Sequence, residues 1–253
     1  MITDSFDDRT KTLIRLEDFY GAQAHIAERC LLVFSRHLHD ELLSRFPCRP
    51  VAEIHSVNGV TPIWCFDLDG KPLAFYLSPV GSTMAAQYCI EANWVCGATR
   101  FILFGSAGSL DAEKTAGRYV LPTEAYRDEG MSYHYAPPAD YIAVPGHAAI
   151  AELFRARGVP YTEGRVWTTD AFLRETAGQV ARRRAEGCIA VEMEIAGVQA
   201  VCDFHGFSLY AFLETGDSFS GDDYSPDGLQ RANHDAYKLA LALEIARSLE
   251  GER

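Results

Sequence analysis

Short apolar runs along the chain alternate with segments in which apolar residues recur at a helical period. The runs at 31–34 and 101–104 predict strands covered on both faces, because neither run contains a polar position. Leu38, Leu42 and Phe46 share one helical face, so we expect a helix over 37–46. The same patterns predict strands at about 160–167, 188–191 and 207–213, and helices at about 83–96, 147–157, 170–186, 195–205 and 228–249.

Three strand-like segments at 51–57, 60–68 and 71–78 are separated by Asn58-Gly59 and Asp69-Gly70. These dipeptides suit the positive φ values of tight hairpin turns, so the region is predicted to form an antiparallel meander.

Residues 111–146 show no clear period and are rich in Tyr, Pro and charged residues, so an irregular segment is expected there. A long ordered loop in a compact domain is often functional. Thr169 or Asp170 is the expected N-cap of the helix at 170–186, and Gly97 suits the end of the helix at 83–96.

Strands that alternate with helices around one meander are typical of the α/β class. We predict a single three-layer α/β/α domain with a mixed central sheet. The chain has 253 residues and is 48% hydrophobic, which is ample for one large core.

The formal net charge of -12 argues against nucleic-acid binding, because phosphates require many Lys and Arg contacts. The net negative charge is still compatible with binding of a small anionic substrate. The acidic N-terminus lacks an apolar leader and no apolar run reaches membrane-spanning length, so we expect no membrane partner and a cytoplasmic location.

The seven cysteines are odd in number, and no two form C-x-x-C. This usage predicts reduced, buried thiols. The chain has no H-E-x-x-H motif, and His37 and His39 lie on different faces of the predicted helix. We therefore expect no required metal.

A glycine- and serine-rich segment, Gly105-Ser106-Ala107-Gly108, directly follows the apolar run at 101–104. Glycine permits conformations in which successive N–H groups converge on an anion, and the Ser106 hydroxyl adds a donor. The segment lacks the lysine of the G-x-x-x-x-G-K-[ST] phosphate loop. An anion-binding loop and a plain tight turn are both consistent with it.

Two carboxylates stand two residues apart in Val191-Glu192-Met193-Glu194. If strand geometry continues, Glu192 and Glu194 point to the same side and can accept from two vicinal sugar hydroxyls. Negative charge there also favours an oxocarbenium-like transition state. Met193 offers apolar surface beneath the sugar. Alternatively, the acids complement the dipole of the next helix.

Asp217 follows the strand predicted at 207–213. A carboxyl group at the C-terminal end of a central strand is the usual place for α/β chemistry, and when protonated it can donate to a purine N7. Phe172, at the start of a predicted helix, can stack on a flat base. A turn cap and a core aromatic are the structural alternatives. These constellations together predict cleavage of an N-glycosidic bond.

Five segments together resemble the nucleoside phosphorylase superfamily, which includes purine nucleoside phosphorylase, uridine phosphorylase and the hydrolytic methylthioadenosine/S-adenosylhomocysteine nucleosidase. They occur in the family's order and at about its spacings. The resemblance implies a phosphorylase-like domain at 30–253 after an N-terminal extension at 1–29. The segments are Pro79-Val80-Gly81, Phe104-Gly105-Ser106-Ala107-Gly108, Thr169-Asp170-Ala171-Phe172, Val191-Glu192-Met193-Glu194 and Gly216-Asp217-Ser218.

The resemblance implies that Glu194 binds ribose, with Met193 beneath the sugar and Glu192 beside them in the pocket. Phe172 matches the position that stacks against the base. Asp217 matches the acid of the purine-cleaving members, which the uridine enzymes lack, so a purine is favoured.

On the phosphate side, Ser106 matches the hydroxyl residue that contacts phosphate, and Gly105 supplies backbone. Phosphate is then a co-substrate, and no cofactor is expected. The resemblance also implies a homo-oligomer (a dimer, trimer or hexamer) in which a neighbouring subunit often completes the site.

The sequence departs from the family at two places. Phosphorylases usually carry Arg where this chain has Leu103, and the glycine-arginine loop after the first strand is altered to Phe34-Ser35-Arg36-His37. Arg36 and Arg127 are candidate replacements, because bidentate guanidinium contacts are among the strongest for phosphate. His134 and Arg174 are weaker polar candidates.

The favoured interpretation is a nucleoside phosphorylase that gives free base and (deoxy)ribose 1-phosphate. The hydrolytic members also lack the arginine, so a nucleosidase that uses water is the main alternative. A non-catalytic nucleoside-binding protein is a third reading, against which the carboxylates argue. From its composition, the acidic segment at 217–224 is a candidate lid.

Overall fold

The computed structural model describes residues 1–220 and 223–249. Gly221 and Asp222, which belong to the candidate lid, lie outside the described residues. The strands are β1 (Arg29–Val33), β2 (Arg49–Ser56), β3 (Gly59–Leu68), β4 (Lys71–Leu77), β5 (Arg100–Ser109), β6 (Tyr119–Asp128), β7 (Tyr141–Ala143), β8 (Tyr161–Thr169), β9 (Cys188–Glu192), β10 (Ser208–Ser220) and β11 (Asp223–Ser225).

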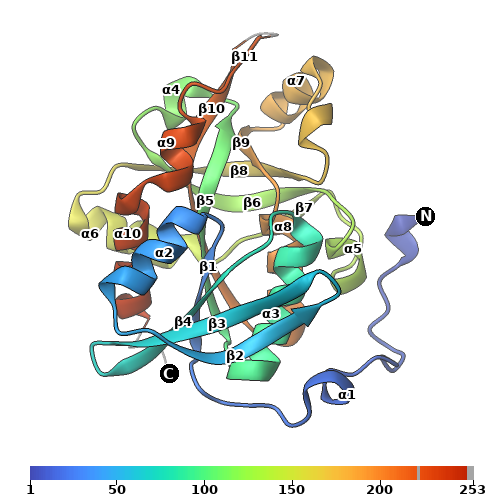
Figure 1. Cartoon of the computed structure of the whole chain (residues 1–253). Helices are drawn as coiled ribbons and strands as arrows, with labels where there is room; N and C mark the ends of the chain where they lie inside the picture. The colour runs from blue at the N-terminus through green and yellow to red at the C-terminus, as the bar shows by residue number, and fades with distance from the viewer. Residues whose placement is uncertain (221–222, 250–253) are drawn as a thin grey trace.

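All these strands belong to one mixed sheet with the order β11-β10-β6-β8-β9-β5-β1-β4-β3-β2, and β7 pairs with β6. β5 also pairs with β10 in parallel, so β5, β10, β6, β8 and β9 form a closed ring of paired strands. The remaining strands continue outward from β5 through β1 (Figure 1). Every strand of the ring is therefore linked to β5 directly or through one neighbour.

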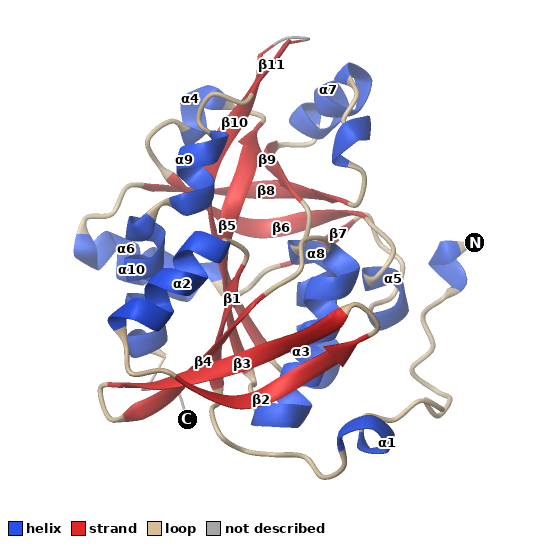
Figure 2. Ribbon diagram, viewed as in Figure 1, coloured by secondary structure: helices blue, strands red, loops and turns tan. Residues whose placement is uncertain are grey.

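Helices cover both faces of the sheet (Figure 2). On one face α2, α6 and α10 pack in a core cluster with β1, β5 and β10. On the other face α3 and α8 form a second cluster, with α5 against it. The helices are α1 (Glu17–Tyr20), α2 (Arg36–Arg45), α3 (Ser82–Cys96), α4 (Ala112–Thr115), α5 (Ser132–Tyr135), α6 (His147–Arg157), α7 (Ala177–Ala185), α8 (Ile195–His205), α9 (Leu229–His234) and α10 (Ala236–Ser248), with 3-10 turns η1 (Ile2–Asp4) and η2 (Phe172–Arg174).

The predicted fold class is confirmed, because a mixed sheet lies between two helical layers. The predicted meander is present as β2, β3 and β4, which pair antiparallel in sequence order. Its second turn uses left-handed backbone at Asp69 (φ 55°) and Gly70 (φ 87°), as its sequence indicated. Gly97 ends α3 in the left-handed conformation that was expected of it.

The prediction of an irregular segment at 111–146 is wrong. The segment contains β6, a ten-residue strand of the ring, together with α4, α5 and β7. The register of β6 against β8 shifts between Pro122 and Glu124. A bulge of this kind breaks the alternation of buried and exposed positions, so the strand shows no clean period in the sequence.

Two helix predictions also need correction. The expected helix at 170–186 divides into η2 and α7, and Thr176, not Thr169 or Asp170, caps α7 in a reciprocal capping box with Gln179. The expected helix at 228–249 is interrupted at Asp235, whose side chain accepts a hydrogen bond from the backbone N–H of Tyr237, at 3.0 Å, and caps α10.

The cysteines are unpaired thiols, and six of them are buried, while Cys48 is partly exposed. Burial raises the pKa of the Cys89 and Cys96 thiols to about 12 and so disfavours the reactive thiolate. The cysteines therefore act as core residues. Within the described part of the chain, no helix is long and apolar enough to cross a membrane.

Two glycines provide opposite tests of the packing. A Cβ on Gly146, which precedes α6, would lie 2.0 Å from the backbone oxygen of Leu209, whereas a Cβ on Gly178 in α7 would meet nothing within 4 Å. We expect Gly146→Ala to lower the free energy of unfolding by about 3 kcal/mol or more. Gly178→Ala should raise it by about 0.4 to 1 kcal/mol, because alanine restricts the unfolded chain. Urea unfolding measures the free energy of unfolding of both variants, and equal changes in the two would contradict this account of the packing.

Candidate active site

A gap in the pairing of β5 locates the candidate site. The ladder between β1 and β5 ends at Val33 and Phe104, and β9 joins the same edge of β5 only from Gly108 onward. The other edge stays paired with β10 throughout. Over 105–107, the first edge thus has no strand partner among the described residues. A cavity of about 680 Å³ opens there.

The wall of this one cavity includes the eight main residues that the sequence predicted for the site, although three weaker candidates lie elsewhere. The wall residues come from the N-terminal end of α2, from β5, from η2, from the β9–α8 junction and from β10. These segments are far apart in the sequence, and the fold brings them together. The residues are Arg36, Gly105, Ser106, Phe172, Glu192, Met193, Glu194 and Asp217.

The prediction of a converging anion-binding loop at Gly105-Ser106-Ala107-Gly108 is wrong in its geometry. These residues continue β5, and their backbone pairs with Leu213 through Asp217 of β10. N–H groups of an extended strand alternate between its two edges and do not converge. Gly108 serves close packing instead, since a Cβ there would lie 2.9 Å from Val191 Cγ1 and 3.2 Å from Asp217 Oδ2.

Glu192 and Glu194 have different environments. Strand β9 ends at Glu192, so the strand repeat does not relate the two carboxylates. Glu192 is buried, and its Oε2 accepts from the backbone N–H groups of Glu194 (2.6 Å) and Ile195 (2.8 Å), while Thr168 donates to Oε1. This carboxylate thus satisfies the first turn of α8. Its predicted contact with substrate is not needed to explain its position.

Glu194 is only partly buried and holds the segment before α3. Its Oε1 accepts from the backbone N–H of Gly81 at 2.7 Å, and no other side chain of the described residues bonds to it. The carboxylate therefore has lone pairs left for a ligand. Burial is the main cause that raises the pKa of both Glu192 and Glu194, and the charge of Glu194 adds to the effect at Glu192.

Asp217 lies beyond a bulge in β10. The register against β5 shifts between Thr215 and Asp217, which places Asp217 opposite Gly108 on the cavity wall. Burial raises its pKa, and a hydrogen bond with Tyr224 opposes the shift. Phe172 is 57% exposed at the rim of the cavity. The alternative interpretation, in which Phe172 is a core aromatic, is therefore wrong. No group of three or more potential metal ligands occurs among the described residues.

Glu175 is a cavity residue that the sequence analysis missed. It follows η2, and burial raises the pKa of its carboxyl group to about 7, with the nearby charge of Asp217 as the second cause. Nothing in the surrounding Arg174-Glu175-Thr176 distinguishes it from a surface glutamate. Only the fold reveals that this carboxyl group and Asp217 share one end of the cavity.

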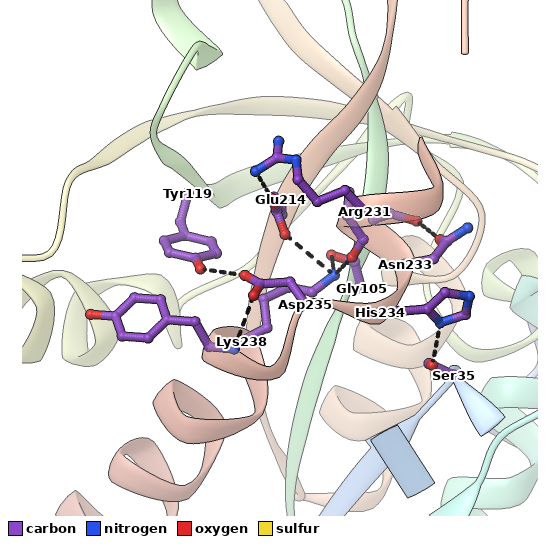
Figure 3. Close-up of polar contacts among 12 residues, drawn as sticks. Ser35, Gly105, Tyr119, Glu214, Arg231, Asn233, His234, Asp235 and Lys238 are labelled. Atoms are coloured by element: carbon purple, nitrogen blue, oxygen red, sulfur yellow. Dashed lines mark hydrogen bonds and ion pairs between the residues drawn. The ribbon is translucent and has the colours of Figure 1, made fainter. Parts of the chain in front are cut away.

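At another part of the wall, two serine hydroxyls meet consecutive residues of α9. Ser106 Oγ donates to Asn233 Oδ1 at 2.6 Å. Ser35 Oγ lies 2.8 Å from His234 Nδ1, and Figure 3 shows this pair. Arg36 also lines the cavity here and makes no hydrogen bond or ion pair with another described residue. We call these five residues the α9 end of the cavity. The sequence analysis found only Ser106 and Arg36.

Lys238 of α10 is a buried cation behind the α9 end. Its Nζ donates to the carbonyl oxygens of Gly105 (3.2 Å) and Ala232, and lies 3.8 Å from Glu214 Oε2. Burial lowers the pKa of Lys238 to about 8, against the attraction of Glu214 and Asp235. A lysine within the apolar run of a helix is the sequence signal that points to such a role.

The other cations considered from the sequence lie elsewhere. Leu103 is buried in the core at the position where phosphorylases usually carry Arg. Arg127 does not replace that residue, because its guanidinium donates to Ser132 and to the Pro137 carbonyl, and it is not on the cavity wall. His134 and Arg174 are not on the wall either.

The family is established by a match of residues 29–243 to the model of the phosphorylase superfamily. The chain therefore belongs to the phosphorylase superfamily. A DeoD-type purine nucleoside phosphorylase of Exiguobacterium sibiricum is 24% identical over 236 residues, which cover 89% of this chain and 97% of the relative. A guanosine phosphorylase of Halorubrum lacusprofundi is 32% identical over 136 residues, 53% of this chain and 56% of the relative.

A solved structure shows the same fold. The 5'-methylthioadenosine/S-adenosyl homocysteine nucleosidase of Campylobacter jejuni superimposes with a TM-score of 0.70 at 16% identity, over 89% of this chain and 100% of that one. At that identity the likeness concerns the architecture alone. The relatives similar in sequence are phosphorylases, and this structural neighbour is a nucleosidase.

Glu175 allows a test of the cavity's electrostatics. A pKa raised from 4.5 to about 7 means that the folded protein keeps a proton that the unfolded chain has released, so stability falls as pH rises through this range. Glu175→Gln should reduce the loss of unfolding free energy between about pH 5 and about pH 8 by on the order of 1 to 3 kcal/mol. Urea unfolding at both values measures it, with the exposed Glu113→Gln as control. Identical pH slopes for wild type and Glu175→Gln would contradict the assignment.

Proposed function

We propose that the protein cleaves the N-glycosidic bond of a purine nucleoside with phosphate, giving free base and (deoxy)ribose 1-phosphate. The observation that carries the proposal is that Glu194 and Asp217 line one cavity together with the α9 end, where Arg36 has no ion-pair partner among the described residues. The phosphorylases among the sequence relatives support phosphorolysis. A homo-oligomer in the cytoplasm remains part of the proposal.

In this mechanism each carboxyl group has one task. Glu194 accepts hydrogen bonds from the ribose hydroxyls with its free lone pairs, and Met193 lies beneath the sugar. Its negative charge stabilises the positive charge that develops on the sugar. Glu192 holds the first turn of α8, and thereby Glu194, in place.

At the base, Phe172 stacks on the purine and Asp217 donates a proton to N7 as the bond to C1′ breaks. Burial favours this role, because a raised pKa keeps the carboxyl group protonated at higher pH. Phosphate attacks C1′ from the α9 end, where Arg36 contacts its oxygens and Ser106 lines the cavity. No cofactor takes part in this scheme.

Hydrolysis by water is the second candidate, and a specific observation favours it. Leu103 stands at the position of the usual phosphate-binding arginine. The guanidinium of Arg127 donates instead to Ser132 and to the Pro137 carbonyl in the segment that follows β6. The α9 end therefore has fewer guanidinium groups than a typical phosphorylase. Water needs no such cation.

Base release with and without inorganic phosphate distinguishes the two reactions. We expect release from a panel of purine nucleosides to depend on phosphate, because phosphate is the attacking group. Mass spectrometry of the products should show ribose 1-phosphate or its deoxy form. Equally fast release without phosphate, with free ribose as product, would establish hydrolysis and refute phosphorolysis. Tight nucleoside binding without any turnover would instead support a binding protein.

Asp217→Asn tests the proton donor. The variant keeps the size of the side chain but cannot supply an acidic proton, so purine release should slow by about 100- to 10,000-fold. Cleavage of a riboside whose leaving group needs no protonation, such as a p-nitrophenyl riboside, should change far less. Comparison of kcat for the two substrates measures this difference. Full purine activity in Asp217→Asn would show that another group donates the proton.

A further inference from the structure

We propose that Asn233 and His234 of α9 bind the oxygens of inorganic phosphate together with Arg36, and that Ser35 and Ser106 orient these two side chains. These two residues then compensate for the cation that is missing at position 103. The inference rests on the proposed phosphorolysis for its place in the reaction. The affinity for inorganic phosphate, however, can be measured without any turnover.

The first argument is the convergence of three segments. Ser35 comes from the start of α2, Ser106 from the unpaired stretch of β5, and the two α9 residues are consecutive in the chain. Each serine hydroxyl contacts one of the pair, at 2.6 Å for Asn233 and at 2.8 Å for His234 (Figure 3). All four side chains also line the cavity. A ligand at this point therefore meets four polar side chains at once.

The proposal uses the tautomer of His234 in which Nδ1 accepts a hydrogen bond from Ser35. Ser35 Oγ already accepts from the backbone N–H of Leu38, at 3.3 Å, as the N-cap of α2. In the tautomer that we assign, the hydroxyl proton of Ser35 is donated to Nδ1 of His234, which acts as acceptor. A neutral imidazole whose Nδ1 accepts carries its proton on Nε2. Nε2 has no partner among the described residues, so it is an available donor for a phosphate oxygen.

Asn233 presents donors by the same reasoning. Its Oδ1 accepts the proton of Ser106, so Ser106 itself has no proton left for an anion in this arrangement. The Nδ2 group of Asn233 carries two N–H donors that no described residue accepts. The sequence analysis assigned the hydrogen-bond donor for phosphate to Ser106, and in this arrangement the Asn233 amide is that donor instead. Ser106 becomes the residue that orients the amide.

The charge at this end suits an anion. Arg36 makes no ion pair with a described residue, and the ring of His37 lies 5.7 Å from that of His234. Lys238 is close, but its Nζ already donates to two carbonyl oxygens and lies near the Glu214 carboxylate. Lys238 is therefore a positioning residue, and Arg36 is the cation that remains for phosphate.

Helix α9 is held firmly enough to offer a preformed site. Lys238 connects the Ala232 carbonyl to that of Gly105 in β5. A Cβ on Gly216 would lie 2.7 Å from the Cβ of Ala232, so α9 packs directly on the bulge of β10. Tyr119 donates to Asp235 at 3.2 Å just after α9. Preorganised donors bind an anion without an ordering cost.

Isothermal titration calorimetry of the full-length protein with inorganic phosphate tests the proposal. We expect wild type to bind phosphate, and both variants to bind it about 10- to 100-fold more weakly, because His234→Ala loses a hydrogen bond to a charged group and Asn233→Asp replaces two N–H donors with a carboxylate that repels phosphate. Asn233→Asp is informative because it retains an acceptor for Ser106 and the shape of the side chain. His234→Gln, whose amide N–H approximates Nε2–H, should recover part of the affinity. The exposed His55→Ala serves as control.

Steady-state kinetics separates binding from a general structural effect. The KM for phosphate should rise in His234→Ala and Asn233→Asp by the same factor as the Kd, while the KM for the nucleoside stays within about twofold. Urea midpoints of the variants identify any loss of fold. Unchanged phosphate affinity in both variants, or a rise in both KM values together, would overturn the assignment.

The outcome is independent of the proposed function. If phosphate binds and the substitutions weaken it, the site is confirmed even where base release proceeds without phosphate. If wild type does not bind phosphate, the site is refuted, whichever reaction the enzyme performs. Phosphate-dependent release with unchanged affinity in the variants would leave phosphorolysis standing and refute the role of α9.

Discussion

The site depends on the change of partner along one edge of β5. Strand β1 leaves that edge at Phe104 and β9 reaches it at Gly108, while β10 occupies the opposite edge continuously. An unpaired stretch of a central strand requires polar partners, because its backbone groups are not satisfied by a ladder. A cavity rather than a core lies at this point, and the ends of β1, β9 and β10 surround it.

The bulge at Gly216 connects the two ends of the cavity. The extra residue in β10 places Asp217 opposite Gly108, and the bare backbone of Gly216 is also the surface on which Ala232 of α9 rests. One glycine thus determines both where the proposed proton donor lies and how closely α9 approaches. Bulges often redirect a side chain near an active site, and here a helix is positioned by the same distortion.

The sequence predicted the elements with uninterrupted patterns and missed those whose pattern tertiary structure breaks. The runs that became β1 and β5, and the hairpin dipeptides of the meander, depend on local preference alone. Strand β6 was missed because a bulge at Pro122 disturbs its alternation. The motif residues on the cavity wall were found from their segments, but Glu175, Asn233 and His234 carry no local signal, since only the packing of η2 and α9 brings them to the wall.

Electrostatics explains how an acidic protein can hold an anion beside four acids. Burial raises the pKa of Glu175, Glu192, Glu194 and Asp217, and the value of about 7 at Glu175 means that this group carries less negative charge near neutral pH than an exposed carboxylate does. The net charge of -12 is distributed mainly over the surface, where salt screens it within about 10 Å. Inside the cavity, the Arg36 guanidinium and the donors of α9, which have no competing partner in the described part of the chain, act at contact distance. The attraction of an anion by these nearby donors exceeds its repulsion by the distant surface charge. An anion at the α9 end would in turn favour protonation of the acids that face it.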